Sequence, residues 1–300
     1  MTNSELFFDT TKIANEQKYV TGDKEIFLKL SKEQMTDAVV LTDNRVLELI
    51  KNASYDGPIV LDRQCRFSVS NIDSFTAAAN NSKDYIFSHG KYKQLVLNFA
   101  NPVEPGGGVK RGAKAQEEDL CIKSTLMCSL ESERAGEYYS YHKNLLSCHK
   151  KPNPFLSSDY MILSPTVEVF RDENNNLSDE TFIVSVLTVA APYVVNGMFN
   201  LSKEDLEAVI FQRIMGILQV SVTYGYKYLV LGAWGCGAFG NDADMVAGLF
   251  YKAFREINCK FLNVNSLFKN VQFAVLHKPE QTYNFDCFKK YFDDFYRDKN

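Results

Sequence analysis

Two adjacent carboxylates, Glu117 and Glu118, follow a run of three glycines and open a predicted helix. Acidic residues are common in the first turn of a helix because they complement its dipole, so the pair could simply be solvated end residues. In a closed site, however, adjacent carboxylates repel each other, and one pKa rises until that group keeps its proton near neutral pH. Such a group can protonate the leaving oxygen of a glycosidic bond. The helix dipole shifts the pKa in the opposite direction, and the sequence leaves both interpretations open.

The three glycines, Gly106, Gly107 and Gly108, lie between a predicted buried strand and this helix. A glycine triplet costs backbone entropy and contributes no side-chain packing. It makes sense where the main chain approaches another group closely and directs N–H donors at it. For a lone triplet, a plain surface turn is an equally good explanation.

A second glycine loop, residues 231–241, also follows a predicted strand and opens a predicted helix. Its N–H groups and the helix N-terminus would suit a diphosphate. Gly235, Gly237 and Gly240 match the G-x-G-x-x-G spacing of dinucleotide-binding enzymes. The loop comes late in the chain, however, and the next predicted strand ends without an acidic residue for a ribose. We expect a phosphate-binding loop, in which Phe239 belongs either to the core or to a ligand stack; an NAD-dependent oxidoreductase is an alternative that this loop alone supports.

The elements that must position these loops follow from the hydrophobic pattern. The first 55 or so residues are predicted to be helical and polar, without strands. From residue 58 onward, short β-rich runs alternate with helical patterns, which is typical of a layered α/β fold. Strands are predicted over residues 59–61, 66–70, 95–99, 160–163, 167–170, 182–189, 228–231 and 271–276.

The main helix signals lie in the second half of the chain. Ser202 precedes Asp205 at capping-box spacing, and apolar residues then recur at helical spacing until Gly225. A second helix is predicted over residues 242–257 with Asn241 as its cap, and a third over residues 285–296. Residues 172–179 are predicted to form an exposed turn between two strands.

Composition narrows the class of protein. The chain has 300 residues with 33 Lys and Arg against 37 Asp and Glu, a net charge of −4, so we expect no non-specific nucleic-acid binding. No apolar run approaches the ~20 residues that cross a bilayer, and the N-terminus lacks the pattern of a signal peptide. We therefore expect an intracellular, soluble protein.

Seven cysteines form an odd set without a Cys-x-x-Cys motif, so neither a disulfide framework nor a compact zinc site is expected. Cys236 and His277 would allow a cysteine enzyme on paper. A loop cysteine with one distant histidine is a common coincidence, however.

The glycine triplet and the acidic pair belong to a longer pattern, N-F-A-N-x₃-P-G-G-G followed by G-A-x-A-Q-E-E. This pattern resembles the signature of microbial-type poly(ADP-ribose) glycohydrolases, a branch of the macrodomain superfamily. Residues 71–78, 160–167, 190–192 and 232–241 resemble the same family. The resemblance covers roughly residues 58–290.

The resemblance implies a three-layer α/β/α macrodomain with a mixed central sheet and an N-terminal helical extension. The extension would span residues 1–57 and the catalytic domain residues 58–300. ADP-ribose would lie in a cleft at the strand ends.

The same resemblance implies an enzyme, a glycosidase that hydrolyses the ribose–ribose O-glycosidic bond of poly(ADP-ribose). Glu118 would be the general acid and base, and Glu117 would hold ribose hydroxyls. Gly106, Gly107 and Gly108 would run along the distal ribose and diphosphate.

Further substrate-binding roles follow from the same match. Asn101 would bind the distal ribose, and Gln116 would support the glycine loop. Gly237, Ala238 and Gly240 would cover the diphosphate from the opposite side, and Phe239 would lie against the distal ribose.

No cofactor and no metal are implied. The expected partners are poly(ADP-ribose) or ADP-ribosylated proteins, with no free nucleic acid and no membrane, and we expect a monomer in the cytoplasm or nucleus. Two alternatives stay open: a non-catalytic ADP-ribose reader, which does not need the carboxylate pair, and a mono-ADP-ribosyl hydrolase.

Overall fold

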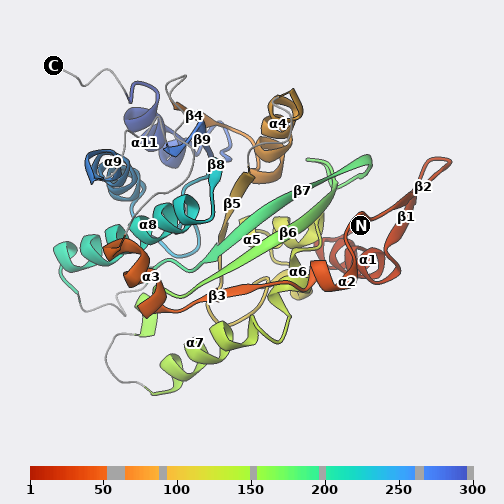
Figure 1. Ribbon diagram of the computed structural model, residues 1–300, viewed down its shortest axis with the longest axis horizontal. Helices are drawn as coiled ribbons and strands as arrows, with labels where there is room; N and C mark the ends of the chain where they lie inside the picture. Colours follow the sequence, from red (N-terminus) through yellow and green to blue (C-terminus); the bar gives the residue numbers. More distant parts are fainter. Residues whose placement is uncertain (53–64, 88–92, 149–153, 196–200, 261–266, 296–300) are drawn as a thin grey trace.

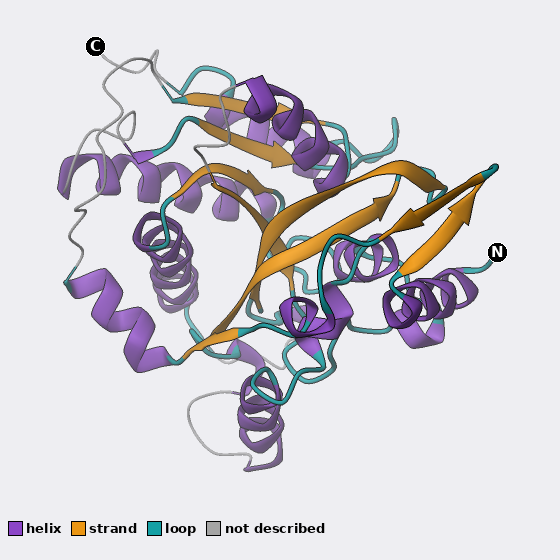
Figure 2. Cartoon of the chain, turned by 45° about the vertical axis from the view of Figure 1, so that its right-hand side comes forward, coloured by secondary structure: helices purple, strands orange, loops and turns teal. Residues whose placement is uncertain are grey.

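The computed structural model describes residues 1–52, 65–87, 93–148, 154–195, 201–260 and 267–295. In these parts of the chain, a seven-stranded mixed sheet lies between two layers of helices (Figure 1, Figure 2). The three-layer α/β/α arrangement expected from the sequence is confirmed.

The sheet has the strand order β3-β6-β7-β5-β8-β9-β4. Its antiparallel part is β3-β6-β7, and β7, β5, β8, β9 and β4 run parallel to one another. The strands are β3 (Val39–Leu41), β4 (Arg66–Ser70), β5 (Lys93–Phe99), β6 (Met161–Arg171), β7 (Leu177–Val189), β8 (Tyr226–Leu231) and β9 (Asn270–Ala274).

Successive side chains of a strand point to opposite faces, so the apolar runs supply two cores. In β5, Leu95 and Leu97 join one cluster and Val96 joins the other. The first cluster is covered by α3 (Asp43–Lys51), α8 (Lys203–Thr223), α9 (Ala243–Lys260) and α11 (Tyr283–Phe292). The second is covered by α1 (Asn3–Glu16), α4 (Ser74–Phe87), α5 (Gln116–Lys123), α6 (Leu126–Leu130) and α7 (Gly136–Cys148).

Most predicted strands and helices are confirmed. The predicted strands 160–163 and 167–170 are one strand, β6, with a register shift between Ser164 and Val167. Ser202 caps α8 as expected, since its side chain accepts a hydrogen bond from the N–H of Asp205 at 3.1 Å. The predicted strand 59–61 lies outside the described residues.

The prediction that the first 55 residues contain no strand is wrong. Strands β1 (Lys18–Thr21) and β2 (Lys24–Phe27) form a hairpin across a two-residue loop at Gly22, whose φ of 57° suits glycine. The hairpin projects from the molecule near the N-terminus (Figure 1). These strands are too short for their alternation to stand out from a polar segment.

Strand β3 is the third strand that the sequence analysis missed, and it pairs antiparallel with β6. Part of the N-terminal segment is therefore an edge of the main sheet. The helix α2 (Lys32–Met35) and a 3₁₀ turn, η2 (Pro154–Leu156), complete the short elements. The division of the chain at residue 57 stays a prediction.

Among the helices of the described residues, one, α8, is long and apolar enough by length and composition to cross a membrane. Within the fold, 61% of its most apolar stretch is buried. It packs against α3, α9 and β8. Its apolar surface is thus accounted for as a core helix of the domain.

Candidate active site

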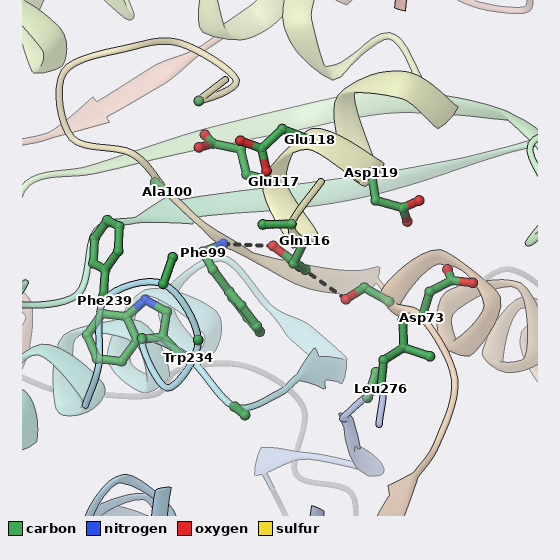
Figure 3. A pocket seen from close by; sticks show the side chains of 18 of the residues that line it. Asp73, Phe99, Ala100, Gln116, Glu117, Glu118, Asp119, Trp234, Phe239 and Leu276 are labelled. Atoms are coloured by element: carbon green, nitrogen blue, oxygen red, sulfur yellow. Dashed lines mark hydrogen bonds between the residues drawn. The ribbon is translucent and has the colours of Figure 1, made fainter. Parts of the chain in front are cut away.

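A cavity of about 520 Å³ opens at the carboxyl ends of the parallel strands. The segments that follow β4, β5, β7, β8 and β9 all contribute to its wall, which is the position where open α/β sheets bind ligands. Figure 3 shows its interior. Its lining residues are Ile72, Asp73, Ser74, Phe99, Ala100, Asn101, Gly107, Lys114, Ala115, Gln116, Glu117, Glu118, Asp119, Ala191, Ala233, Trp234, Gly235, Gly237, Ala238, Phe239, Ala274, Val275, Leu276 and Asn284.

Glu117 lies in the first turn of α5 and is 3% exposed. Its Oε2 accepts a hydrogen bond from the N–H of Asn101 at 2.7 Å, and its Oε1 accepts one from Asn98 Nδ2 at 3.2 Å. Burial raises the pKa of Glu117 to about 8, although these donors and the N–H of Gly106 lower it. The neighbouring carboxylate of Glu118 raises it further. Burial and the charge of Glu118 therefore outweigh the hydrogen bonds that lower the pKa, and Glu117 keeps a proton at neutral pH.

Glu118 is 7% exposed and presents a different pattern of contacts. Its Oε1 accepts a hydrogen bond from the N–H of Gly108 at 2.8 Å. Its Oε2 is buried and has no partner among the described residues. Figure 3 shows both carboxylates side by side at one end of the pocket. Of the two carboxyl groups, Glu118 is thus the one with an oxygen available to a ligand.

The glycine triplet holds this acidic pair. The N–H of Gly107 donates to the carbonyl of Glu104 at 3.0 Å, and the N–H of Gly108 donates to Glu118. A Cβ on Gly107, whose φ is 59°, would lie 2.5 Å from Glu118 Oε1 and 3.1 Å from Glu117 Oε2. Position 107 therefore requires glycine because the carboxylates pack directly against its backbone, whereas a Cβ on Gly108 would first meet Ala113 Cβ, at 2.6 Å.

This use of the N–H groups departs from the expected anion-binding loop. Only Gly107 of the triplet lines the pocket, and Gly106 and Gly108 lie behind it. The predicted contacts of Gly106 and Gly108 with substrate stay predictions. What the sequence could not show is that the donors of this loop already have partners inside the protein.

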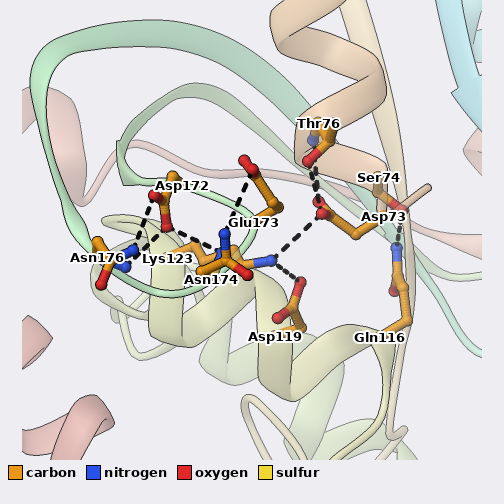
Figure 4. A network of polar contacts seen from close by, with 10 residues as sticks. All are labelled: Asp73, Ser74, Thr76, Gln116, Asp119, Lys123, Asp172, Glu173, Asn174 and Asn176. Carbon is orange, nitrogen blue, oxygen red and sulfur yellow. Dashed lines mark hydrogen bonds and ion pairs between the residues drawn. The ribbon is translucent and has the colours of Figure 1, made fainter.

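Gln116 ties the acidic helix to the sheet. Its Oε1 accepts from the N–H of Phe99 at 2.9 Å, and its Nε2 donates to the carbonyl of Leu97 at 2.8 Å and to Ser74 Oγ at 3.0 Å. Figure 3 shows the contact of Gln116 with Phe99 as a dashed line, and Figure 4 shows its contact with Ser74. Gln116 therefore fastens the start of α5 to β5 and to the first turn of α4, and its support of the glycine loop stays a prediction.

Asn101 and Asn98 flank the end of β5. Asn101 lines the pocket; its Oδ1 accepts from the N–H groups of Val103 and Glu104, and its Nδ2 has no partner among the described residues. Asn98 is fully buried, and its Nδ2 contacts Glu117 and Thr188. Sequence reasoning missed Asn98 as a site residue, although a polar residue inside an apolar strand was the available signal.

The second glycine loop forms the facing wall. Gly237, Ala238 and Phe239 line the pocket, and their N–H groups have no hydrogen-bond acceptor among the described residues. Gly240 does not line it; its φ is 75°, and a Cβ there would lie 2.8 Å from Val195 Cγ2. The ring of Phe239 is partly buried and contacts Tyr193 edge-on at 5.6 Å.

Asn241 was predicted to cap α9, and this prediction is wrong. Asp242 caps the helix instead, because its Oδ1 accepts from the N–H of Met245 at 2.8 Å. Asn241 is buried and donates to the carbonyls of Pro192 and Gly235, at 2.7 and 3.0 Å. It therefore fastens the second loop to the segment after β7.

Asp73 and Asp119, which line the pocket, contact a buried lysine that lies outside the lining, as Figure 4 shows. Lys123 is buried, and its Nζ lies 2.8 Å from Asp119 Oδ2 and 3.5 Å from Asp73 Oδ2. Asp73 also accepts hydrogen bonds from the N–H and hydroxyl of Thr76. The analysis of the sequence singled out neither Lys123 nor Asp119, because nothing in the sequence places them beside the first turn of α4.

Helix α1 contacts the segment that joins the glycine triplet to α5. Ser4 Oγ donates to the carbonyl of Lys110 at 3.0 Å, and Asn3 Nδ2 donates to the carbonyl of Ala113 at 3.3 Å. Both acceptors lie between the glycine triplet and α5, at or just after the 3₁₀ turn η1 (Val109–Arg111). Helix α1 therefore braces the segment that carries Glu117 and Glu118.

The alternative chemistries find no support in the described residues. Cys236 Sγ contacts the carbonyl of Trp234 and burial raises its pKa, whereas His277 contacts the carbonyl of Lys278 and the ring of Phe285. No group of three or more metal-ligating side chains occurs in the part of the chain that is described.

Comparison with protein families gives one decisive match. The family model "Microbial-type PARG, catalytic domain", where PARG is poly(ADP-ribose) glycohydrolase, matches residues 8–172. The chain belongs to this family. Comparison with curated proteins gives no match.

Solved structures of the same family are similar over nearly the whole chain. Poly(ADP-ribose) glycohydrolase from Thermomonospora curvata has 27% identity and a TM-score of 0.80, covering 97% of this chain and 99% of that one. Its complex with the inhibitor ADP-HPD has a TM-score of 0.78. The Deinococcus radiodurans enzyme in complex with ADP-ribose has 28% identity and a TM-score of 0.70, covering 88% of this chain and 98% of that one.

Proposed function

We propose that this protein is a poly(ADP-ribose) glycohydrolase that hydrolyses the ribose–ribose O-glycosidic bond of poly(ADP-ribose) and releases ADP-ribose. Membership of the family and the ligands of its solved relatives support the substrate. The pocket volume of about 520 Å³ lies in the range of small-molecule sites. One observation carries the chemistry: a buried, unpartnered carboxylate oxygen of Glu118 beside a second carboxyl that keeps its proton.

Glu118 and Glu117 have different roles in this proposal. Burial raises the pKa of Glu117 to about 8, so Glu117 keeps its own proton at neutral pH. Both oxygens of Glu117 are engaged by Asn98 and Asn101, so Glu117 is held in place. Glu118 has the free oxygen and is the group that exchanges a proton with substrate.

The reaction consumes one water molecule and returns Glu118 to its starting state. Glu118 gives a proton to the departing 2′ oxygen, and the bond from the anomeric carbon of the distal ribose to that oxygen breaks, with its electrons leaving on the oxygen. The distal ribose then has oxocarbenium character. Water bonds to the anomeric carbon and returns a proton to Glu118. The products are ADP-ribose and a polymer one unit shorter.

The binding roles come from the facing walls of the pocket. The free N–H groups of Gly237, Ala238 and Phe239 would hold the diphosphate, because backbone donors grouped in a loop bind anions. The ring of Phe239 would lie against the distal ribose. The free amide of Asn101 would donate to its hydroxyls.

A single substitution tests the assignment. Glu118→Gln keeps the shape and hydrogen-bonding capacity of the side chain but removes its acidic proton. We expect kcat for release of ADP-ribose from poly(ADP-ribose) to fall by about 10²–10⁴-fold, the usual contribution of general acid–base catalysis. Binding of ADP-ribose, measured by calorimetry, should stay within about threefold, because the diphosphate loop is untouched.

The same experiment separates the alternatives. Wild-type protein and the variant are incubated with poly(ADP-ribose) and with mono-ADP-ribosylated protein, and the freed products are identified. Full activity of Glu118→Gln would remove Glu118 from the catalytic role. Binding without cleavage by the wild type would indicate a reader, and release from the mono-ADP-ribosylated protein alone would indicate a mono-ADP-ribosyl hydrolase.

The wider setting of the reaction is part of the proposal. We expect ADP-ribosylated proteins to carry the polymer to the enzyme, and we expect the enzyme to act as a monomer in the cytoplasm or nucleus. The net charge of −4 supports the absence of non-specific nucleic-acid binding.

A further inference from the structure

Arg111 is a strongly exposed cation beside the acidic pair and does not line the pocket. It ends the 3₁₀ turn η1, and its side chain is 68% exposed. The point where a Cβ on Gly108 would lie is 3.8 Å from Arg111 Nη2 and 3.7 Å from Glu118 Oε1. Glu118 lines the pocket, whereas Gly108 and Arg111 do not. Arg111 therefore lies next to Glu118 but outside the cavity.

Arg111 forms an ion pair with Glu104 that contributes little free energy and can be exchanged for another partner. Its Nη1 and Nη2 donate to the two carboxylate oxygens of Glu104, at 3.2 and 2.6 Å. Both side chains are exposed, and an exposed ion pair contributes only about 0.2–1 kcal/mol to stability. A phosphate, which accepts paired N–H donors equally well, can therefore compete with Glu104 for this guanidinium.

Two further cations accompany this pair. The bond from Arg111 and then the charges of Lys143 and Lys110 lower the pKa of Glu104, so three cations face one carboxylate. Lys110 Nζ pairs with Glu131 at 2.6 Å, whereas Lys143 has no ion-pair partner among the described residues. Arg111 and Lys110 are each paired with one carboxylate, so Lys143 gives this group of side chains a local excess of one positive charge.

The proposed reaction indicates which part of the substrate comes close to these cations. Because Glu118 must reach the leaving oxygen, the rest of the polymer leaves the pocket beside Glu118. Each unit of poly(ADP-ribose) carries a diphosphate, so the unit on the leaving side brings two negative charges to the same region. Cations outside the pocket attract such charges without contributing to the binding of the released ADP-ribose.

We propose that Arg111, with Lys143 and Lys110 beside it, forms a second subsite that binds the diphosphate of the leaving ADP-ribose unit and so favours polymeric substrates. This inference rests on the proposed function and specifies which ADP-ribose linkages the site prefers. The subsite exchanges the contact of Arg111 with Glu104 for one with phosphate. It acts on the leaving side of the bond only.

The test compares two leaving groups on the same enzyme. The substrates are poly(ADP-ribose) and an O-glycoside of ADP-ribose with a neutral phenol, which has no phosphate on the leaving side. We expect Arg111→Gln to lower kcat/KM for the polymer about tenfold more than for the phenol glycoside, as for one lost charge-assisted hydrogen bond. The difference should lie mainly in KM and should shrink as ionic strength rises.

Two further variants give the comparison its controls. Arg134→Gln removes an equally exposed arginine, which pairs with Asp37 away from the pocket, and should change the ratio of the two kcat/KM values by less than twofold. Glu104→Gln frees Arg111 without removing its charge and should lower KM for the polymer.

The outcomes are distinct. An equal loss on both substrates in Arg111→Gln, or no loss on either, overturns the leaving-side subsite and leaves the proposed function intact. If the wild type cleaves neither substrate, the proposed function itself fails.

Discussion

The two glycine loops of this protein follow neighbouring parallel strands and face each other across one pocket, yet the backbone N–H groups of the two loops differ in their hydrogen-bond partners. In the first, residues 106–108, the donors of Gly107 and Gly108 are directed into the protein and hold its own carbonyl and carboxylate groups. In the second, residues 235–240, the donors of Gly237, Ala238 and Phe239 have no acceptor in the parts of the chain that the structure describes. The first loop positions an acid, and the second is open to an anion.

Both loops depend on a buried asparagine. Asn98 donates to Glu117 behind the first loop, and Asn241 donates to the carbonyls of Pro192 and Gly235 in the second. Each of these side chains has an Oδ1 without a partner among the described residues. A glycine-rich sequence alone therefore does not reveal whether its N–H groups serve a ligand; the direction of the donors does.

The largest effect is expected from Gly107→Ala in the first loop. An added Cβ would lie 2.5 Å from Glu118 Oε1, at a φ of 59° that disfavours any side chain, so both carboxylates must move. We expect kcat/KM for poly(ADP-ribose) to fall by at least about 10²-fold, as when catalytic groups are misplaced by about 1 Å.

Gly136→Ala is the matched control, because a Cβ at Gly136 meets no atom within 4 Å. Its activity should equal that of the wild type. If Gly107→Ala keeps full activity, the first loop does not position the acidic pair.

The next effect is a dependence on pH that only the first loop should confer. Because the pKa of Glu117 is raised to about 8 from 4.5, the folded protein holds a proton that the unfolded chain loses between these values. The free energy of unfolding therefore falls as pH rises through this window and levels off above it. Ionisation of Glu117 also places a negative charge beside the catalytic acid Glu118, so kcat/KM should fall about tenfold per pH unit above about pH 8.

Urea denaturation of the wild type and Glu117→Gln at several pH values measures the first part. The variant has no titrating group at this position, so its decline in stability between pH 5 and about 8 should be clearly smaller. Parallel declines in the two proteins would show that Glu117 is ionised in the folded state at neutral pH.

The smallest effect is expected from Gly237→Ala in the second loop. A Cβ at position 237 would meet no protein atom within 4 Å, and the φ of Gly237 is not in the left-handed region. The free energy of unfolding should therefore change by less than about 0.5 kcal/mol. The new methyl group would instead obstruct the approach of a diphosphate to the free N–H groups. We expect the Kd for ADP-ribose to rise about three- to tenfold, as for a modest steric change in a binding site.

Calorimetric titration with ADP-ribose and thermal denaturation of the same sample give both numbers. Unchanged affinity would indicate that the diphosphate does not approach Gly237. A large loss of stability would instead show that this glycine, like Gly107, is required by the fold.

Much of this architecture could be predicted from residue patterns. The apolar runs gave the positions of β5 and β8, and Ser202 with Asp205 marked the start of α8, because burial and capping act over a few neighbouring residues. The hairpin β1–β2 and the edge strand β3 escaped prediction. Strands of three or four residues carry too little pattern, and their pairing partners lie far away in the chain or depend on one turn.

The site, like the fold, contains residues that could be predicted from the sequence and residues that could not. Glu117, Glu118 and Gln116 form a contiguous motif and could be named in advance. Asn98 could not be assigned a role, since its contact with Glu117 depends on how α5 packs on β5. The same holds for Arg111, whose proximity to Glu118 depends on the turn at Gly108.

The sequence by itself determined the residue types at the site, the acidic pair, the glycine loops and the strands that end beside them, because these are local choices of side chain and backbone. Tertiary structure alone decided which carboxyl retains a proton, which glycine donors are free and which cations lie next to Glu118. These properties depend on burial and on contacts between segments distant in the chain, and neither exists before the chain has folded.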